Sequence, residues 1–179
     1  MYVNVKIEKE KAEQLLTKKD GIWPVRKKII KVELFYLPLF IFTVTLEDSK
    51  GSSYKETISV DGIRGEFAFF MATEYSQPEK EITGKVSFSL TELTARDIAL
   101  GEYQRFLLKN NLRNSNISVI AGLTTGVQVY YPYWIGYYKR KRGYDFDVID
   151  AVGGGKQGIK MRPVFIDMIL KTTNTLNNI

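Results

Sequence analysis

The chain has 179 residues and a formal net charge of +6, and it contains no cysteine and no histidine. The absence of these two residue types excludes disulfides, thiol nucleophiles, histidine-based catalytic triads and ordinary zinc sites. Its 44% hydrophobic and 26% charged residues are typical of a globular protein. Residues 1–11 lack the apolar core of a signal peptide, so we expect a cytoplasmic protein.

The first half predicts a helix followed by three strands. Residues 8–18 place Ala12, Leu15 and Leu16 on one helical face, and the following Asp-Gly pair indicates the helix end. The longest apolar stretch, residues 34–44, is about half of the ~20 residues needed to span a bilayer as a helix, so it predicts a buried strand and no transmembrane segment. A second strand should lie within residues 54–65, which end in a turn, and a third should cover residues 66–71.

The second half predicts the same order of elements. Residues 74–85 carry Pro78 and several charges and are typical of a linker. Thr94 and Asp97 resemble a helix capping pair, and the helix should end by Asn110. Strands should follow at residues 127–137, 144–149 and 157–161. Pro163 favours the start of a C-terminal helix with a frayed polar tail from Thr172.

Two segments share a pattern that indicates an internal duplication. Tyr36-x-Pro38 and Tyr130-x-Pro132 are each followed by an aromatic residue and an isoleucine, at one constant offset. Each segment leads to an Asp-x-x-x-Gly ending, at residues 61–65 and 150–154. Aspartate and glycine are the residues that such turns require. The alternative is two unrelated aromatic hairpins, because strands are generally rich in such residues.

These elements predict an α+β fold. We expect two diverged helix-plus-antiparallel-hairpin units, with the helices packed on twisted antiparallel sheets. The expected boundaries are residues 1–75 for the first unit, 76–90 for a linker, and 91–179 for the second unit with its C-terminal helix.

The order of helix, long strand and a strand ending in Val-Asp-x-x-x-Gly resembles the PepSY-like domains, here in two tandem copies. The resemblance is carried by Ala12 and by residues 54–65 and 144–154. The Tyr-x-Pro strand is unusual for that family. The resemblance implies small α+β modules that inhibit or bind proteins, often in secreted proteins, whereas this chain shows no export signal.

Residues 150–158 contain two candidates for chemistry. The segment 153–158, Gly-Gly-Gly-Lys-Gln-Gly, could cradle a phosphate, but it lacks the spacing and the Ser or Thr of a phosphate-binding loop, so a glycine-rich turn is the alternative. Asp145, Asp147 and Asp150 could bind a hard cation or act in acid–base catalysis, or they could form a solvated face. We expect no cofactor, no metal and no catalytic residue.

The segment 130–142 combines aromatic residues with four consecutive cations. If Tyr131, Tyr133 and Trp134 face outward, they form a partner-binding surface for another protein or for self-association; covering helices would instead bury them. Lys139, Arg140, Lys141 and Arg142 could bind an anion, such as nucleic acid or an anionic surface, or form a solvated hairpin tip. A second basic cluster lies at residues 26–31.

These observations favour a non-catalytic protein-interaction or assembly module. The alternatives are binding of nucleic acid or an anionic surface through the basic hairpin, and an enzyme that uses Asp, Lys or Tyr.

Overall fold

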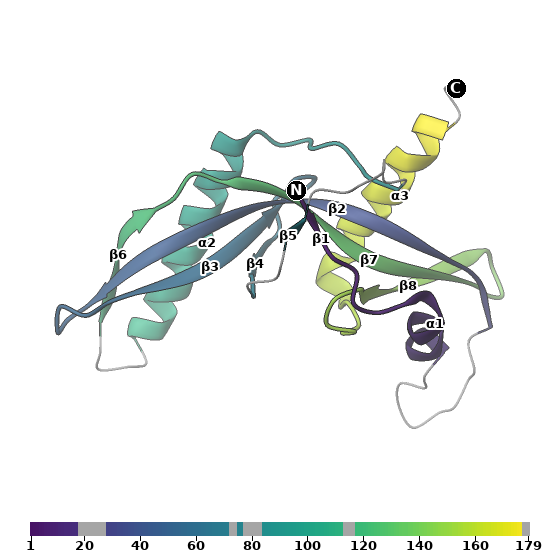
Figure 1. The fold of residues 1–179 in the computed structure, drawn as a ribbon, viewed down its shortest axis with the longest axis horizontal. Helices are drawn as coiled ribbons and strands as arrows, with labels where there is room; N and C mark the ends of the chain where they lie inside the picture. The colour runs from purple at the N-terminus through teal and green to yellow at the C-terminus, as the bar shows by residue number, and fades with distance from the viewer. Residues whose placement is uncertain (18–27, 72–74, 77–83, 113–116, 177–179) are drawn as a thin grey trace. The chain divides into compact units, whose positions relative to one another are not determined.

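The computed structural model describes residues 1–17, 28–71, 75–76, 84–112 and 117–176. Figure 1 shows an α+β protein, which confirms the predicted class. Among the described residues, no helix has the length and apolar character needed to cross a membrane. The helices are α1 (Lys9–Thr17), α2 (Glu92–Asn111), α3 (Arg162–Leu176) and the short 3-10 helix η1 (Ile159–Met161). The strands are β1 (Tyr2–Val3), β2 (Ile29–Asp48), β3 (Ser53–Asp61), β4 (Phe67–Phe69), β5 (Tyr75–Ser76), β6 (Ser118–Leu123), β7 (Val127–Lys139) and β8 (Tyr144–Asp150).

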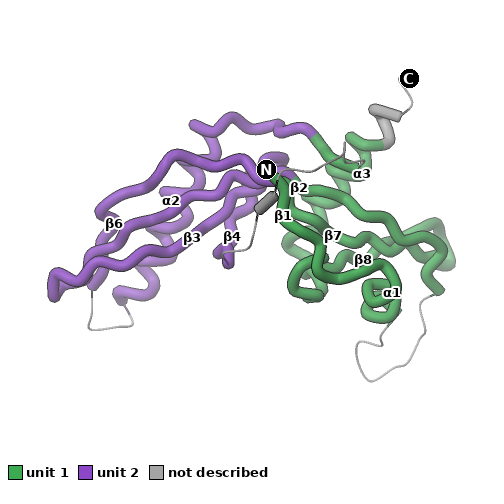
Figure 2. Tube along the Cα trace, viewed as in Figure 1, with its two compact units in different colours: residues 1–37, 74–86, 130–179 green, residues 38–73, 87–129 purple. Residues whose placement is uncertain are grey.

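The chain forms two compact units that differ from the predicted division at residues 1–75 and 91–179. Unit 1 contains Met1–Leu37, Glu74–Val86 and Tyr130–Ile179, and unit 2 contains Pro38–Thr73 and Ser87–Val129 (Figure 2). Each unit therefore takes residues from both halves of the sequence. The reason is that each helix packs on the hairpin of the other half: α1 contacts β8, and α2 contacts β3.

Unit 2 is an antiparallel sheet with helix α2 on one face. β3 pairs with β4 and with β2, and β2 also pairs with β6. Even-numbered residues of β2 from Phe40 to Leu46 pack against Ala95, Ala99 and Tyr103 of α2. The small alanines let the helix approach the sheet closely. Helix α2 begins one turn earlier than predicted, because Thr91 is the N-cap and accepts a hydrogen bond from the Thr94 backbone N–H at 3.2 Å.

Unit 1 contains a mixed sheet, covered partly by α1. β8 pairs antiparallel with β7, whereas β1 pairs parallel with β7 and antiparallel with β5. The sheet is therefore not wholly antiparallel as expected. Ala12 and Leu16 of α1 pack with Trp134, Ile149 and Ala151. The strand predicted at residues 157–161 is wrong: Gln157 and Gly158 belong to no strand, and η1 covers Ile159–Met161 and leads into α3.

The turn after β3 and the turn after β8 contain the same hydrogen bonds. In unit 2 the Asp61 backbone N–H donates to Glu66 O at 3.0 Å, and the Gly65 N–H donates to Asp61 O at 3.1 Å. In unit 1 the corresponding bonds run from Asp150 to Gly155 at 2.8 Å and from Gly154 to Asp150 at 2.9 Å. Both Gly65 and Gly154 have positive φ, at 84° and 74°, as the turn sequence predicts.

The residue after each turn aspartate also has matching partners. Gly62 N–H donates to Pro38 O at 2.7 Å, and Ala151 N–H donates to Pro132 O at 3.1 Å. The Gly62 carbonyl accepts the N–H groups of residues 89 and 90 ahead of α2. The Ala151 carbonyl likewise accepts those of residues 6 and 7 ahead of α1. The two prolines therefore lie in β strands and supply acceptors, which proline can do without an N–H.

Candidate functional site

The predicted partner-binding row is buried. Tyr131, Tyr133 and Trp134 are 9%, 8% and 9% exposed, so the expectation that they face outward is wrong. Tyr133 packs on Phe165 of α3 with 5.0 Å between ring centroids, and Trp134 belongs to the core under α1. Because the side chains on both faces of β7 are covered, its aromatic residues pack inside unit 1.

The polar ends of these buried side chains have partners. The Tyr131 hydroxyl donates to the Asp150 carboxylate at 3.0 Å, and burial together with that negative charge raises the pKa of Tyr131. The Trp134 indole N–H donates to the Ile7 carbonyl at 2.6 Å. Buried hydroxyl and indole groups need such partners. These contacts show that Tyr131 and Trp134 serve as core residues of unit 1.

The hairpin tip that joins β7 to β8 is exposed and basic. Lys139, Arg140, Lys141 and Arg142 are all exposed. The Arg140 backbone N–H donates to Gly143 O at 3.0 Å, and Gly143 has a φ of 87°, which glycine adopts without a steric penalty. The backbone turn thus directs four consecutive cations into solvent.

Only some of the tip cations are neutralised by carboxylates. Arg140 forms an ion pair with Asp145 at 2.5 Å, and Arg162 of α3 contacts the same carboxylate. Burial by itself would raise the pKa of Asp145, but the hydrogen bonds from Arg162 and from the Phe146 backbone, with the charges of both arginines, lower it overall. Asp145 therefore stays ionised and holds the two guanidinium groups together.

Lys139, Lys141 and Arg142 form no ion pair with any carboxylate among the described residues. Tyr144 lies opposite Lys139 in the strand register and is 75% exposed. Tyr144 is the first residue of β8, at the end of the strand far from its buried residues Val148 and Ile149. The outcome is three unpaired cations beside an exposed aromatic ring.

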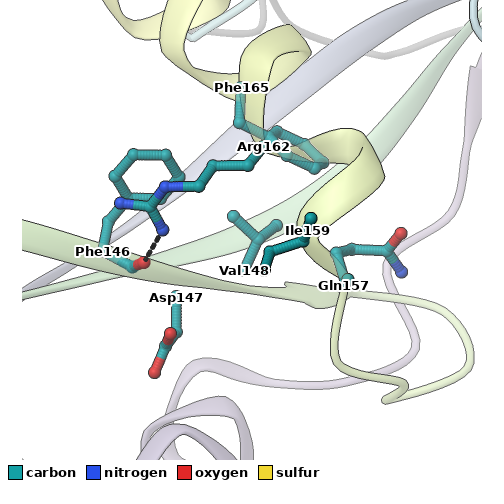
Figure 3. A pocket seen from close by; sticks show the side chains of 8 residues that line it. Phe146, Asp147, Val148, Gln157, Ile159, Arg162 and Phe165 are labelled. Atoms are coloured by element: carbon teal, nitrogen blue, oxygen red, sulfur yellow. Dashed lines mark hydrogen bonds between the residues drawn. The ribbon is translucent and has the colours of Figure 1, made fainter.

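A small pocket lies beside the first turn of α3. Figure 3 shows the Arg162 guanidinium stacked on the Phe146 ring, 4.5 Å from its centroid, and donating a hydrogen bond to the Phe146 carbonyl at 3.2 Å. Val148, Ile159 and Phe165 supply the apolar walls. The pocket volume is about 120 Å³, well below the roughly 300–1,000 Å³ typical of small-molecule sites. Arg162 had no sequence signal, because its role depends on the approach of α3 to β8.

The three candidate cation ligands do not converge. Asp145 binds the two arginines, Asp147 lies 3.5 Å from Lys156, and Asp150 accepts from Tyr131 and from its own turn. No cluster of three or more potential ligands for a metal ion occurs in the described part of the chain. Asp145 and Asp147 share a face of β8 because they are two residues apart, but each carboxylate is held by its own cationic partners, and Asp150 lies at the turn that ends the strand.

The glycine-rich segment forms a turn. The Asp150 carboxylate accepts the backbone N–H groups of Val152 and Gly153, at 2.7 and 3.0 Å. Within the segment, the Gly154 N–H donates to the Asp150 carbonyl and the Gln157 N–H to the Val148 carbonyl, both at 2.9 Å. Backbone N–H groups that a phosphate cradle would need therefore already have acceptors inside the protein, which favours the glycine-rich turn.

Of the second basic cluster, Arg26 and Lys27 lie outside the described residues. Lys31 pairs with Glu33 at 2.7 Å.

Comparisons of the chain with protein-family models, with curated proteins and with solved structures found no match.

Proposed function

We propose that the protein is a non-catalytic binding module that holds an anionic macromolecule at the tip of the β7–β8 hairpin. The observation that carries this proposal is the exposure of Lys139, Lys141 and Arg142 without carboxylate partners in the described structure. The like charges of Lys139, Lys141 and Arg142 repel one another, so these three side chains add nothing to the folding of the hairpin. A negatively charged ligand would relieve this repulsion.

Comparison with the β2–β3 hairpin supports the proposal. That tip has the sequence Asp-Ser-Lys-Gly-Ser at residues 48–52, and its Asp48 carboxylate accepts the N–H groups of Lys50 and Ser52 at 2.9 and 2.8 Å. Gly51 and Gly143 both have positive φ. A hairpin of this kind therefore forms without a cluster of cations, so the cluster at residues 139–142 calls for a different explanation.

We also propose that the two halves of the chain arose by duplication. The matching bonds at Asp61 and Asp150, at Pro38 and Pro132, and at the starts of α1 and α2 support this proposal. After a duplication, one hairpin tip is free to acquire a binding role. A cytoplasmic setting, expected from the sequence, is part of the same proposal.

The tip should bind weakly and with a clear dependence on salt. If three cations meet three phosphates of a single strand, the affinity falls about twentyfold between 50 and 200 mM salt. A fourth contact from Arg140 would steepen this dependence.

The experiment measures binding of fluorescent heparin, a polyanion without bases, by anisotropy at several salt concentrations. Lys139→Glu combined with Lys141→Glu should abolish the binding. The control is Lys50→Glu with Lys55→Glu, which changes the net charge equally at exposed positions of unit 2. If the two double variants bind heparin equally well, the tip is not the binding site.

A second candidate function is protein assembly through unit 2. Leu108, Leu112, Ile117 and Val119 are 56–84% exposed, and β6 carries no charged residue or proline to protect its edge. The Asn111 side chain bonds to the Ser118 backbone and holds α2 beside β6. A second copy of the chain could cover these side chains, consistent with the protein-binding role that the PepSY-like resemblance implies.

Sedimentation measured over a range of concentrations tests this candidate. A dimer of the native sequence that dissociates in Leu108→Glu with Val119→Glu supports it. A native chain that is monomeric at every concentration contradicts it.

A further inference from the structure

We infer that the anionic ligand of the tip is single-stranded nucleic acid, with the Tyr144 ring stacked on a base while the neighbouring cations meet phosphates. This inference rests on the proposed function and specifies its ligand. The independent observation behind it is the solvent exposure of the Tyr144 ring, which the cation cluster alone does not explain.

Tyr144 differs from the three buried tyrosines of its hairpin. Tyr131, Tyr133 and Tyr138 are buried, and each has a hydrogen bond or a ring contact. Tyr144 is 75% exposed, and within the described part of the chain its side chain makes no hydrogen bond and its ring stacks on no other ring. A tyrosine ring contributes to folding mainly through buried area, so this ring contributes little.

The position of Tyr144 suits the recognition of a nucleotide. Tyr144 is directly paired with Lys139, so their Cβ atoms are about 4.5–5.5 Å apart. Arg142 precedes Tyr144 by two residues at the same end of the hairpin. A flat ring and two cations therefore lie within the reach of one nucleotide, which carries a base and a phosphate.

The exposed ring favours a single strand over a duplex. In a duplex the base faces are covered by their neighbours in the stack, whereas unpaired bases present their faces to aromatic side chains. Duplex DNA would still attract the cations through its phosphates, but it would leave the ring unused. Stacking on one base contributes about 1–3 kcal/mol, which corresponds to about 5- to 150-fold in affinity.

The test compares three ligands by fluorescence anisotropy on the full chain: a short oligothymidine, a duplex of the same length, and vesicles containing phosphatidylserine. We expect the oligothymidine to bind more tightly than the duplex. Tyr144→Ala should weaken oligothymidine binding about 5- to 150-fold and leave duplex binding within twofold. Tyr144→Phe keeps the ring and should bind oligothymidine within about twofold of the native chain.

Tyr54→Ala is the matched control, because Tyr54 is also an exposed tyrosine but lies on β3 of unit 2. The inference is overturned if the duplex or the vesicles bind as tightly as oligothymidine, or if Tyr144→Ala has no effect. In those cases the heparin result still decides the proposed function separately. If no ligand depends on Lys139 and Lys141, both proposals are wrong.

Discussion

At the scale of single residues, two aspartates hold the turns after β3 and β8. Asp61 is 1% exposed, and its carboxylate accepts the backbone N–H groups of Ile63 and Arg64 at 2.9 and 2.8 Å, and that of Glu66. Burial raises the pKa of Asp61 even though these hydrogen bonds oppose the shift. Asp150 has two such backbone donors and lies in a less buried turn.

Asp61→Ala should therefore lower the free energy of unfolding more than Asp150→Ala. We expect about 2–4 kcal/mol for Asp61→Ala, because buried N–H groups lose their acceptor, and about 1–2 kcal/mol for Asp150→Ala, whose donors can turn to water. Urea unfolding of the two variants measures both values. A larger effect at Asp150 would show that the Tyr131 hydrogen bond matters more than the turn.

Asp145 should make the stability depend on pH in the acidic range. Its pKa is lowered in the folded state, so its contribution is fully present above the unfolded value of about 3.9 and is lost as the pH falls through the folded pKa. Asp145→Asn should cost about 1–3 kcal/mol at neutral pH and much less near pH 2. Urea unfolding at the two pH values gives the difference, with the exposed Asp97→Asn as the control. An equal cost at both pH values would contradict the assignment.

At the scale of elements, helix α1 packs closely on β7 because Gly136 has no side chain at the point of contact. A Cβ atom on Gly136 would lie 2.7 Å from the Leu16 Cδ1 atom, and Leu16 is 2% exposed. The glycine in the strand therefore gives the helix the space to approach. The sequence indicated both the helix and the strand, but it could not pair this leucine with this glycine.

The fit of Leu16 against Gly136 can be tested with a double-mutant cycle. Leu16→Ala should cost about 2–5 kcal/mol because it leaves a cavity, and Gly136→Ala should cost about 1–3 kcal/mol because it overpacks the contact. Together they should cost less than the two separate effects added, since the smaller helix residue makes room for the new methyl group. Urea unfolding of the four proteins provides the cycle. Strict additivity would contradict the contact.

At the scale of the whole molecule, each compact unit needs both halves of the chain. Helix α1 contacts β8 and α2 contacts β3, so a fragment containing one half has a helix and a hairpin that belong to different units. Neither residues 1–83 nor residues 84–179 should fold alone, because each would expose the apolar faces of its hairpin and helix. Mixing the two fragments should restore the structure.

Circular dichroism of the separate and mixed fragments measures this outcome. The control is the intact chain under the same conditions. Cooperative unfolding of the isolated fragment 84–179 would favour instead the division predicted from the sequence.

Features that depend on residues close together in the chain were predictable from the amino-acid sequence. Helical spacing located α1 and α2 within a few residues, and the apolar run at residues 34–44 predicted the buried part of β2. The Asp-x-x-x-Gly endings predicted two turns, because aspartate and glycine supply the local hydrogen bonds and the positive φ that these turns need.

Which elements cover one another depends on long-range packing and was not predictable from local patterns. Strand alternation gives Tyr131 and Tyr133 a common face, but whether that face meets solvent depends on α3, whose docking brings Phe165 onto Tyr133. The exchange of helices between the hairpins and the approach of Arg162 to Asp145 likewise join residues far apart in the chain. Such contacts are selected by the total apolar area that the whole chain buries. They therefore cannot be predicted from patterns of neighbouring residues.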